Sequence, residues 1–294
     1  MKPAWSWQFE AGRLASATPL PLPSPSTADW AWGGSRGAGV RVAVVDSGID
    51  ASHPAVGEVV GGVSLTYDPA APDQVRVTDG PHEDLFGHGT ACAGIIRSLA
   101  PEAELYSVRV LGARLTGKGM VFAAGLRWAI DHGMQVVNLS LSTGKRDYFA
   151  VFHELVDEAY FANLMLVCAV NNLAGPTYPS QYASVFSVAA NQATDPYRFD
   201  YNPAPPVEFG APGIDIEVPW LGRSTIRATG NSFAAPHIAG LVARILGKHP
   251  GLTPFQVKTI LLSLASNAAG RSGRSKSTDN PRGDPWADDA IQFR

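Results

Sequence analysis

Three residues of the kinds that perform nucleophilic catalysis stand in short, glycine-containing segments that lie far apart in the chain. These are Asp46 in Val44-Val-Asp-Ser-Gly-Ile-Asp50, His88 in Asp84-Leu-Phe-Gly-His-Gly-Thr90 and Ser232 in Gly230-Asn-Ser-Phe-Ala-Ala-Pro-His237. A serine hydroxyl is a weak nucleophile, so it needs a base within hydrogen-bond reach and a carboxylate that orients the base. Together the three side chains would form one complete set for acyl transfer.

Each of the three residues also has an ordinary structural interpretation. Ser232 could be a plain N-cap at the start of a helix, because serine is common there. His88 could be a loop histidine between two glycines, and Asp46 could cap a turn at the end of a strand. Taken singly, none of the three segments decides between structure and catalysis.

The elements that would position these side chains alternate along the chain. Continuous apolar runs, typical of parallel strands buried on both faces, predict strands at 40–45, 105–110, 135–139, 164–170 and 185–190. Helical spacing of apolar residues predicts helices at about 89–99, 119–131, 149–162 and 233–248, and Thr253-Pro-Phe-Gln256 predicts a capping box that begins one more. This alternation predicts an α/β fold: three layers, doubly wound, with a mostly parallel sheet and helices on both faces.

The predicted strands also gather polar side chains at one edge of the sheet. Asp46 follows the first strand directly, and Ser140 and Asn172 stand at or just beyond the ends of two others. In open α/β sheets, ligands bind beyond the carboxyl ends of the strands. His88 and Ser232 instead open predicted helices, where backbone N–H groups are unpaired.

The three segments resemble the active-site signatures of the subtilisin-like (subtilase, S8-type) serine peptidases. That family has Asp-[Ser/Thr]-Gly, His-Gly-Thr and Gly-Thr-Ser-Met-Ala-x-Pro-His; this chain has Asp46-Ser-Gly48, His88-Gly-Thr90 and Gly230-Asn-Ser-Phe-Ala-Ala-Pro-His237, in the same order. The resemblance implies a peptidase domain over residues 28–268. A proline-rich lead-in (1–27), with an extended polyproline stretch, would precede it, and a polar tail (269–294) would follow it.

The resemblance also implies the role of each residue. Ser232 would attack the scissile carbonyl, His88 would act as base and then acid, and Asp46 would hold the imidazole. The family's oxyanion-hole asparagine corresponds to Asn172, although a slip of one residue would make it Asn171. His237 corresponds to a structural histidine.

Substrate in this family binds as an added β-strand, so the partner implied is an extended peptide or protein segment. The substrate-binding residues implied are Ser140, Leu141, Ser142, Ala169, Val170 and Asn171. Ser142 and Asn171 stand where the family usually has glycine. We therefore expect an S1 pocket that is narrower or more polar than that of a broadly specific relative.

We expect no cofactor and no metal. The helix after His88 runs directly into the next strand, without the insertion that carries a strong calcium site in many family members. The cluster His82, Glu83, Asp84 and His88 lacks the spacing of a zinc motif. Both cysteines, Cys92 and Cys168, lie in apolar segments and are expected to be reduced core thiols, Cys92 resembling a subset of subtilases with a thiol beneath the histidine.

Composition narrows the partners and the compartment. The formal net charge of −3 over 294 residues favours neither nucleic acid nor an anionic membrane. The sequence contains no run of about 18 apolar residues and no signal-peptide h-region, so we expect a cytoplasmic protein, with secretion by a leaderless route as the alternative. The short lead-in favours intracellular processing, such as leader-peptide removal. Two alternatives of the same fold remain: a pseudopeptidase that binds or scaffolds, and a peptide ligase or macrocyclase.

Overall fold

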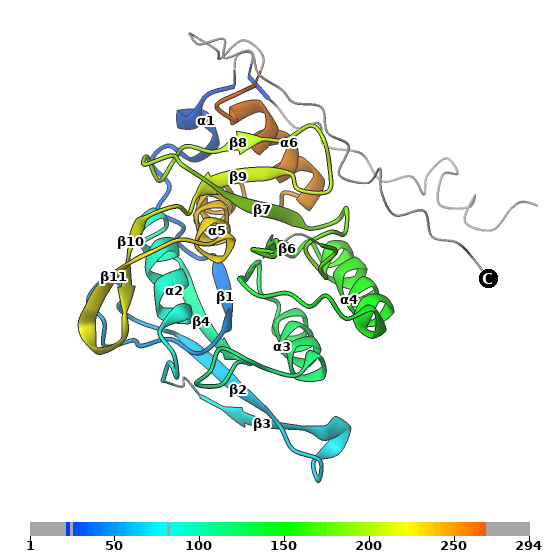
Figure 1. Cartoon of the computed structure of the whole chain (residues 1–294). Coiled ribbons are helices and arrows are strands. Elements are labelled where there is room, and N and C mark those ends of the chain that lie inside the picture. Colours follow the sequence, from blue (N-terminus) through cyan, green and yellow to red (C-terminus); the bar gives the residue numbers. More distant parts are fainter. Residues whose placement is uncertain (1–21, 24–25, 81–82, 174, 269–294) are drawn as a thin grey trace, which may run out of the picture.

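A mixed, mostly parallel sheet forms the centre of the computed structural model, which describes residues 22–23, 26–80, 83–173 and 175–268 (Figure 1). In spatial order the strands are β3 (Val75–Asp79), β2 (Gly61–Tyr67), β4 (Glu104–Arg109), β1 (Arg41–Asp46), β5 (Val136–Leu139), β6 (Met165–Ala169), β7 (Phe186–Asn191), β9 (Phe209–Pro212) and β8 (Asp200–Tyr201). Neighbours from β2 to β9 run parallel, whereas the two edge strands, β3 and β8, are antiparallel. The parallel sheet predicted from the apolar runs is therefore confirmed.

Strand β1 shows why a continuous apolar run was the right signal for this sheet. Its residues alternate between two hydrophobic clusters on opposite faces: Val42 and Val44 belong to one, and Ala43 and Val45 to the other. All four are buried. A strand covered on both faces has no solvent side, so its sequence needs no polar alternation.

Helices cover both faces of the sheet, which completes the three layers. On one face lie α1 (Ala28–Trp32), α2 (His88–Leu99), α5 (Asn231–Lys248) and α6 (Pro254–Leu264); on the other lie α3 (Gly119–Asp131) and α4 (Phe149–Phe161). Short 3-10 turns occur at Pro72–Gln74, Arg146–Tyr148 and Leu221–Arg223. The predicted capping box of α6 is present, with the Thr253 hydroxyl accepting from the Gln256 N–H.

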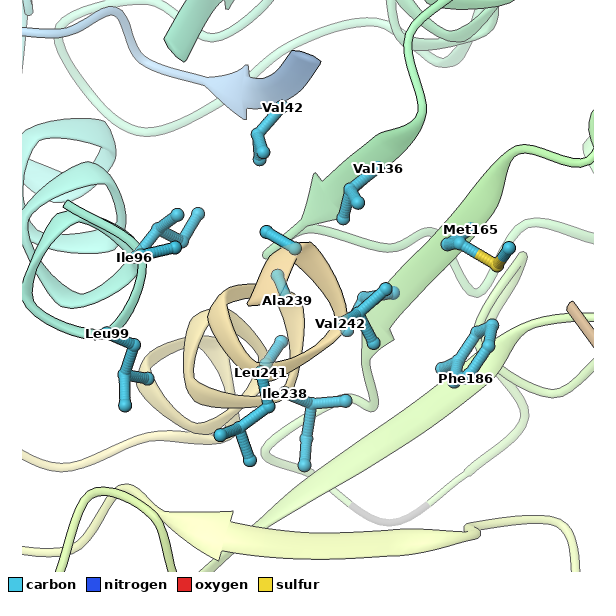
Figure 2. Packing of buried hydrophobic residues seen from close by; sticks show 14 of the residues in the cluster. Val42, Ile96, Leu99, Val136, Met165, Phe186, Ile238, Ala239, Leu241 and Val242 are labelled. Carbon is cyan, nitrogen blue, oxygen red and sulfur yellow. The ribbon is translucent and has the colours of Figure 1, made fainter. Parts of the chain in front are cut away.

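Helix α5 packs against the sheet and against α2, and most of its residues are buried. Figure 2 shows side chains of α5, α2 and the strands converging in one core, including Ile238, Val242 and Leu99. Gly240 makes the approach of the two helices possible, because a Cβ there would stand 2.8 Å from the Leu99 Cβ and 3.0 Å from its Cδ1. Helix α5, which carries Ser232 in its first turn, and helix α2, which begins at His88, are thus held in a fixed position relative to each other.

The predicted elements are present with ends shifted by one or two residues, but several others escaped prediction. These are α1, β2, β3, β8, β9 and a separate hairpin of β10 (Ile216–Trp220) and β11 (Ser224–Ala228). They are short, or lie at an edge with exposed polar residues, or contain glycine or proline, so they carry little apolar periodicity. The predicted tail (269–294) and most of the predicted lead-in (1–27) lie outside the described residues.

The close contact between α2 and α5 leads to a stability prediction. Gly240→Val should lower the free energy of unfolding by about 1–3 kcal/mol, since the added methyl groups overpack the contact with Leu99. Gly210→Val is a matched control, because a Cβ at Gly210 meets nothing closer than 3.6 Å. Urea unfolding followed by circular dichroism measures both variants. Equal stability of the two would contradict the packing described for Gly240.

Candidate active site

The end of β1 and the start of α2 bring a carboxylate and an imidazole into direct contact. His88 Nδ1 donates to the Asp46 carboxylate, with both oxygens 2.9 Å away. Asp46 is fully buried and His88 is 5% exposed. Because an ionised carboxylate only accepts hydrogen bonds, the Nδ1 atom carries the proton and Nε2 is left as the basic nitrogen.

A second buried carboxylate, Asp84, holds the turn that leads into the histidine. One of its oxygens accepts from the backbone N–H groups of Phe86 (2.9 Å) and Gly87 (2.8 Å) and from the Ser47 hydroxyl (2.8 Å). The other accepts from the N–H (2.8 Å) and the hydroxyl (2.6 Å) of Thr90. These bonds tie the start of α2 to the end of β1, so the base is positioned by both elements.

The glycines that flank His88 are required by close contacts. Gly87 has a φ of +113° and its Cβ position lies 2.5 Å from the Trp220 ring of the hairpin. A Cβ at Gly89 would stand 2.0 Å from the Gly48 carbonyl oxygen. Side chains at these positions would push the imidazole away from Asp46.

Ser232 stands in the first turn of α5 and shares a cavity with His88. Its carbonyl oxygen accepts from the Ser140 hydroxyl at 2.7 Å and from the Cys92 thiol at 3.6 Å, which anchors its backbone. Among the described residues, none makes a hydrogen bond to the Ser232 hydroxyl. That hydroxyl therefore faces a shared cavity with the imidazole and has no partner among these residues. Catalytic hydrogen bonds often tighten only when substrate binds.

The cavity has a volume of about 380 Å³ and contains nearly every site residue that the sequence predicted. Its walls include His88, Ser140, Leu141, Ser142, Ala169, Val170, Asn171, Asn172 and Ser232. Asp46 lies behind His88 and does not reach the cavity surface. The structure therefore brings together residues from the ends of β5 and β6 and the starts of α2 and α5.

One wall of the cavity was missed by the sequence reasoning. It is formed by the segment that follows β4, with Val110, Leu111, Leu115, Thr116, Gly117, Lys118 and Gly119, together with Phe122, Thr143 and Lys145. The segment carries no motif. The signal that could have found it is its place beyond the carboxyl end of a parallel strand next to β1.

A hydrogen bond to the side-chain oxygen of Asn172 orients its amide group. Its Oδ1 accepts from the backbone N–H of Asn231 at 2.9 Å. The other end, Nδ2, lies 3.6 Å from the position that a Cβ on Gly230 would occupy, and the Ser232 Oγ lies 3.3 Å from the same position. The amide nitrogen and the serine hydroxyl thus lie on the same side of Gly230.

The surroundings of the site raise the pKa values of both the His88 imidazole and the Cys92 thiol. Burial by itself lowers the pKa of His88, but the charge of Asp46, its hydrogen bond and the charge of Asp84 raise the pKa above its ordinary value. Burial, and then Asp46, raise the pKa of the Cys92 thiol well above its usual range. Burial lowers the pKa of His237 to about 4, so this histidine is neutral and structural, donating through Nδ1 to the Phe233 carbonyl.

Both cysteines are free and buried, as predicted. Among the described residues, Asp46, His88 and Cys92 are the group that offers metal-ligand atoms within 4.8 Å of one another. A soft metal ion bound by these atoms would take up the same imidazole and carboxylate that form the Asp46–His88 pair. Such an ion would therefore compete with any proton transfer through His88.

Comparison with known proteins decides the family. A model of the "Subtilase family" matches residues 37–283. The chain belongs to the subtilase family. It is 33% identical over 234 residues to a thermostable alkaline protease of Halalkalibacterium halodurans, covering 76% of this chain and 61% of that protein. It is 32% identical over 249 residues to subtilisin DY of Bacillus licheniformis, covering 80% of this chain and 86% of that protein.

A solved structure of a cold adapted subtilisin-like serine proteinase has the same fold. It superimposes with a TM-score of 0.62 at 26% identity, covering 85% of this chain and 90% of the other. The three-layer α/β architecture predicted from the sequence is therefore that of this subtilase. Within the described residues, no helix is both long and apolar enough to cross a membrane.

The raised pKa of His88 leads to a prediction about pH. If His88 is the base, only its neutral form is active, so kcat/KM should fall as the pH drops through its pKa. The midpoint should lie above the value of about 6.5 for a free imidazole. Initial rates on a peptide substrate from pH 5 to 9 measure it.

His237→Gln serves as the control for that pH profile, since a histidine that is already neutral cannot contribute to the limb. The same midpoint is expected in this variant. A profile that is flat between pH 5 and 9, or a midpoint that moves in His237→Gln, would contradict the assignment of the base to His88.

Proposed function

We propose that this protein is a serine endopeptidase that hydrolyses peptide bonds through an acyl-enzyme, with Asp46, His88 and Ser232 as its catalytic triad. The observation that carries the proposal is the buried Asp46–His88 pair, whose imidazole lines the same cavity as Ser232. In this proposal the base is oriented before substrate arrives. Membership of the subtilase family, whose matched relatives are named as proteases and subtilisins, supports the same chemistry.

The proposed reaction has two halves. Ser232 Oγ attacks the scissile carbonyl while His88 Nε2 removes its proton, and the Asp46 carboxylate stabilises the imidazolium that forms. The tetrahedral intermediate collapses when the imidazolium protonates the leaving amine, which leaves an acyl-enzyme. A water molecule, deprotonated by the same Nε2, then releases the acid and restores the Ser232 hydroxyl. Side chains and water supply every group, so the proposal needs no cofactor or metal.

Asn172 is proposed as the side-chain donor to the oxyanion. Its oxygen is already occupied by the Asn231 N–H, so the end of the amide that remains available is the donor Nδ2. The N–H of Ser232, at the start of α5, would be the second donor, since helix N-termini present unpaired N–H groups. Asn171, the alternative, contributes its carbonyl oxygen to a hydrogen bond with the Asn231 side chain.

The substrate is proposed to lie extended in the cavity, against Ser140–Ser142 on one side and Ala169–Asn171 on the other. The cavity wall contains two lysines, Lys118 and Lys145, and no carboxylate lines the cavity among the described residues. This charge favours peptides with acidic residues near the cut.

The narrower form of the proposal is an intracellular processing role, such as removal of leader segments from a precursor. This role rests on the expectation that the side chains of Ser142 and Asn171, which line the cavity, favour small or polar P1 residues and so selective cleavage. A pseudopeptidase that only binds peptides, and a ligase in which an amine intercepts the acyl-enzyme, are the alternatives.

Active-site labelling separates a peptidase from a pseudopeptidase. A fluorophosphonate probe should label the wild-type protein, and Ser232→Ala should abolish both labelling and hydrolysis, a loss of about 10⁶-fold in kcat for the corresponding change in subtilisin. Ser142→Ala is the matched control, since it changes a cavity serine outside the proposed triad. Wild-type protein without labelling, or Ser232→Ala with full labelling, would refute the proposal.

Cleavage of a peptide library tests the proposed substrate preference. Small or polar P1 residues should be favoured over large aromatic ones, and acidic residues should be enriched near the cut. The acidic enrichment should weaken at high salt and in Lys145→Glu, because it depends on charge attraction. Adding a peptide amine to the same reactions reveals ligation by mass. Frequent cleavage after large aromatic residues would contradict the expected pocket.

A further inference from the structure

Asn231, the residue before the proposed nucleophile, makes hydrogen bonds to two segments that meet at the site, strand β7 and the loop after β6. Its Oδ1 accepts from the Ala190 N–H of β7 at 2.8 Å. Its Nδ2 donates to the carbonyl oxygens of Val170 (3.2 Å) and Asn171 (3.0 Å), in the loop after β6. Both donor hydrogens and the acceptor of this amide are therefore used.

The backbone of the same residue holds the proposed oxyanion donor. The Asn231 N–H lies at the start of α5, where backbone N–H groups have no partner within the helix. It donates to Asn172 Oδ1 at 2.9 Å. An amide whose oxygen is occupied in this way cannot turn over without losing that bond. The orientation that remains directs Nδ2 toward the side of Gly230 on which the Ser232 hydroxyl lies.

The loop that Asn231 holds has little else to fix it. Asn171 and Asn172 are both exposed. Among the hydrogen bonds between described residues, those to Asn231 are the ones that Asn171 and Asn172 make. The neighbouring Val170 has one further bond, from its N–H to the Val188 carbonyl oxygen at 3.0 Å.

We propose that Asn231 is a positioning residue that sets the oxyanion hole, acting through Asn172. Its side chain clamps the 170–171 backbone to β7, and its N–H fixes the direction of the Asn172 amide. The inference rests on the proposed function. It adds a role for the position before the nucleophile, where the family usually has threonine. Here the side-chain amide at that position makes three hydrogen bonds that join the 170–171 backbone to β7. Preorganised donors stabilise a tetrahedral oxyanion without reorganising during the reaction.

A double-mutant cycle on the full-length protein tests this role. Removing the donor itself in Asn172→Ala should lower kcat by about 10²–10³-fold, the loss measured for such a donor in subtilisin, a relative of this chain. Asn231→Ala should lower kcat by about 10- to 100-fold, because a misplaced donor loses part of that effect. KM should change by less than about 3-fold, since the loss falls on the transition state.

The cycle distinguishes positioning from general structural support. In the Asn172→Ala background, Asn231→Ala should cost less than about 3-fold in kcat, because the donor that it positions is already absent. Asn191→Ala is the matched control. It removes an amide at the end of β7 that bonds Asp200 and the Ala193 N–H but does not touch the 170–172 loop, and it should leave kcat unchanged.

Two outcomes would overturn the inference: wild-type kcat in Asn231→Ala, or losses that multiply in the double variant. If Asn231→Ala fails to fold by circular dichroism, Asn231→Ser enters the same cycle with the same expectation, since a serine cannot bond both carbonyls and Ala190. Labelling of wild-type Ser232 by the fluorophosphonate probe is measured separately from the double-mutant cycle. Loss of that labelling would count against the proposed function, whereas a failed cycle with intact labelling counts against Asn231 alone.

Discussion

The site depends on one buried contact, the hydrogen bond between the Asp46 carboxylate and His88 Nδ1. An ionised carboxylate with no exposure is costly unless its oxygens are bonded, because burial removes its hydration. Asp46 has the imidazole and the Ser47 N–H, at 2.7 Å, as partners. The same contact sets the tautomer of the histidine and raises its pKa, so the orientation of the base and its basicity have one origin.

The remaining contacts hold this pair in register with the nucleophile. Asp84 ties the start of α2 to the end of β1, and the packing of Leu99 on Gly240 ties α2 to α5. Since His88 opens α2 and Ser232 lies in the first turn of α5, two helix starts deliver the proposed base and nucleophile to one cavity. The contacts that pack the core around α2 and α5 therefore also fix the relative positions of the proposed base and nucleophile.

The cavity combines rigid and exposed parts. The carboxyl ends of buried parallel strands carry Asp46, Ser140 and Ala169, and these residues are buried or nearly so. The proposed oxyanion donor, Asn172, and its neighbour Asn171 instead belong to an exposed loop. The hydrogen bonds of Asn231 connect that exposed loop to β7 and to the start of α5, which fixes the place of the proposed donor.

The sequence by itself was sufficient for the architecture, and it named most of the residues that line the cavity. Buried strands such as 40–45 and amphipathic helices such as 149–162 are local patterns, and the glycines beside His88 mark close contacts that no other residue allows. The motifs around Asp46, His88 and Ser232 identified the family, and every predicted cavity residue lies where the chain was expected to bring it.

Tertiary structure decided what depends on neighbours that are distant in the chain. The cavity wall at 110–119, the bond from the Ser47 hydroxyl to Asp84 and the hydrogen bonds of Asn231 leave no periodic or motif signal, because each arises from contacts between segments tens of residues apart. Short edge strands were missed for the same reason, since their pairing partner, not their own composition, makes them strands. Local sequence thus determined the buried strands, the amphipathic helices and the side chains that can react, because these depend on nearby residues. Packing determined the short strands and how the reactive side chains face one another.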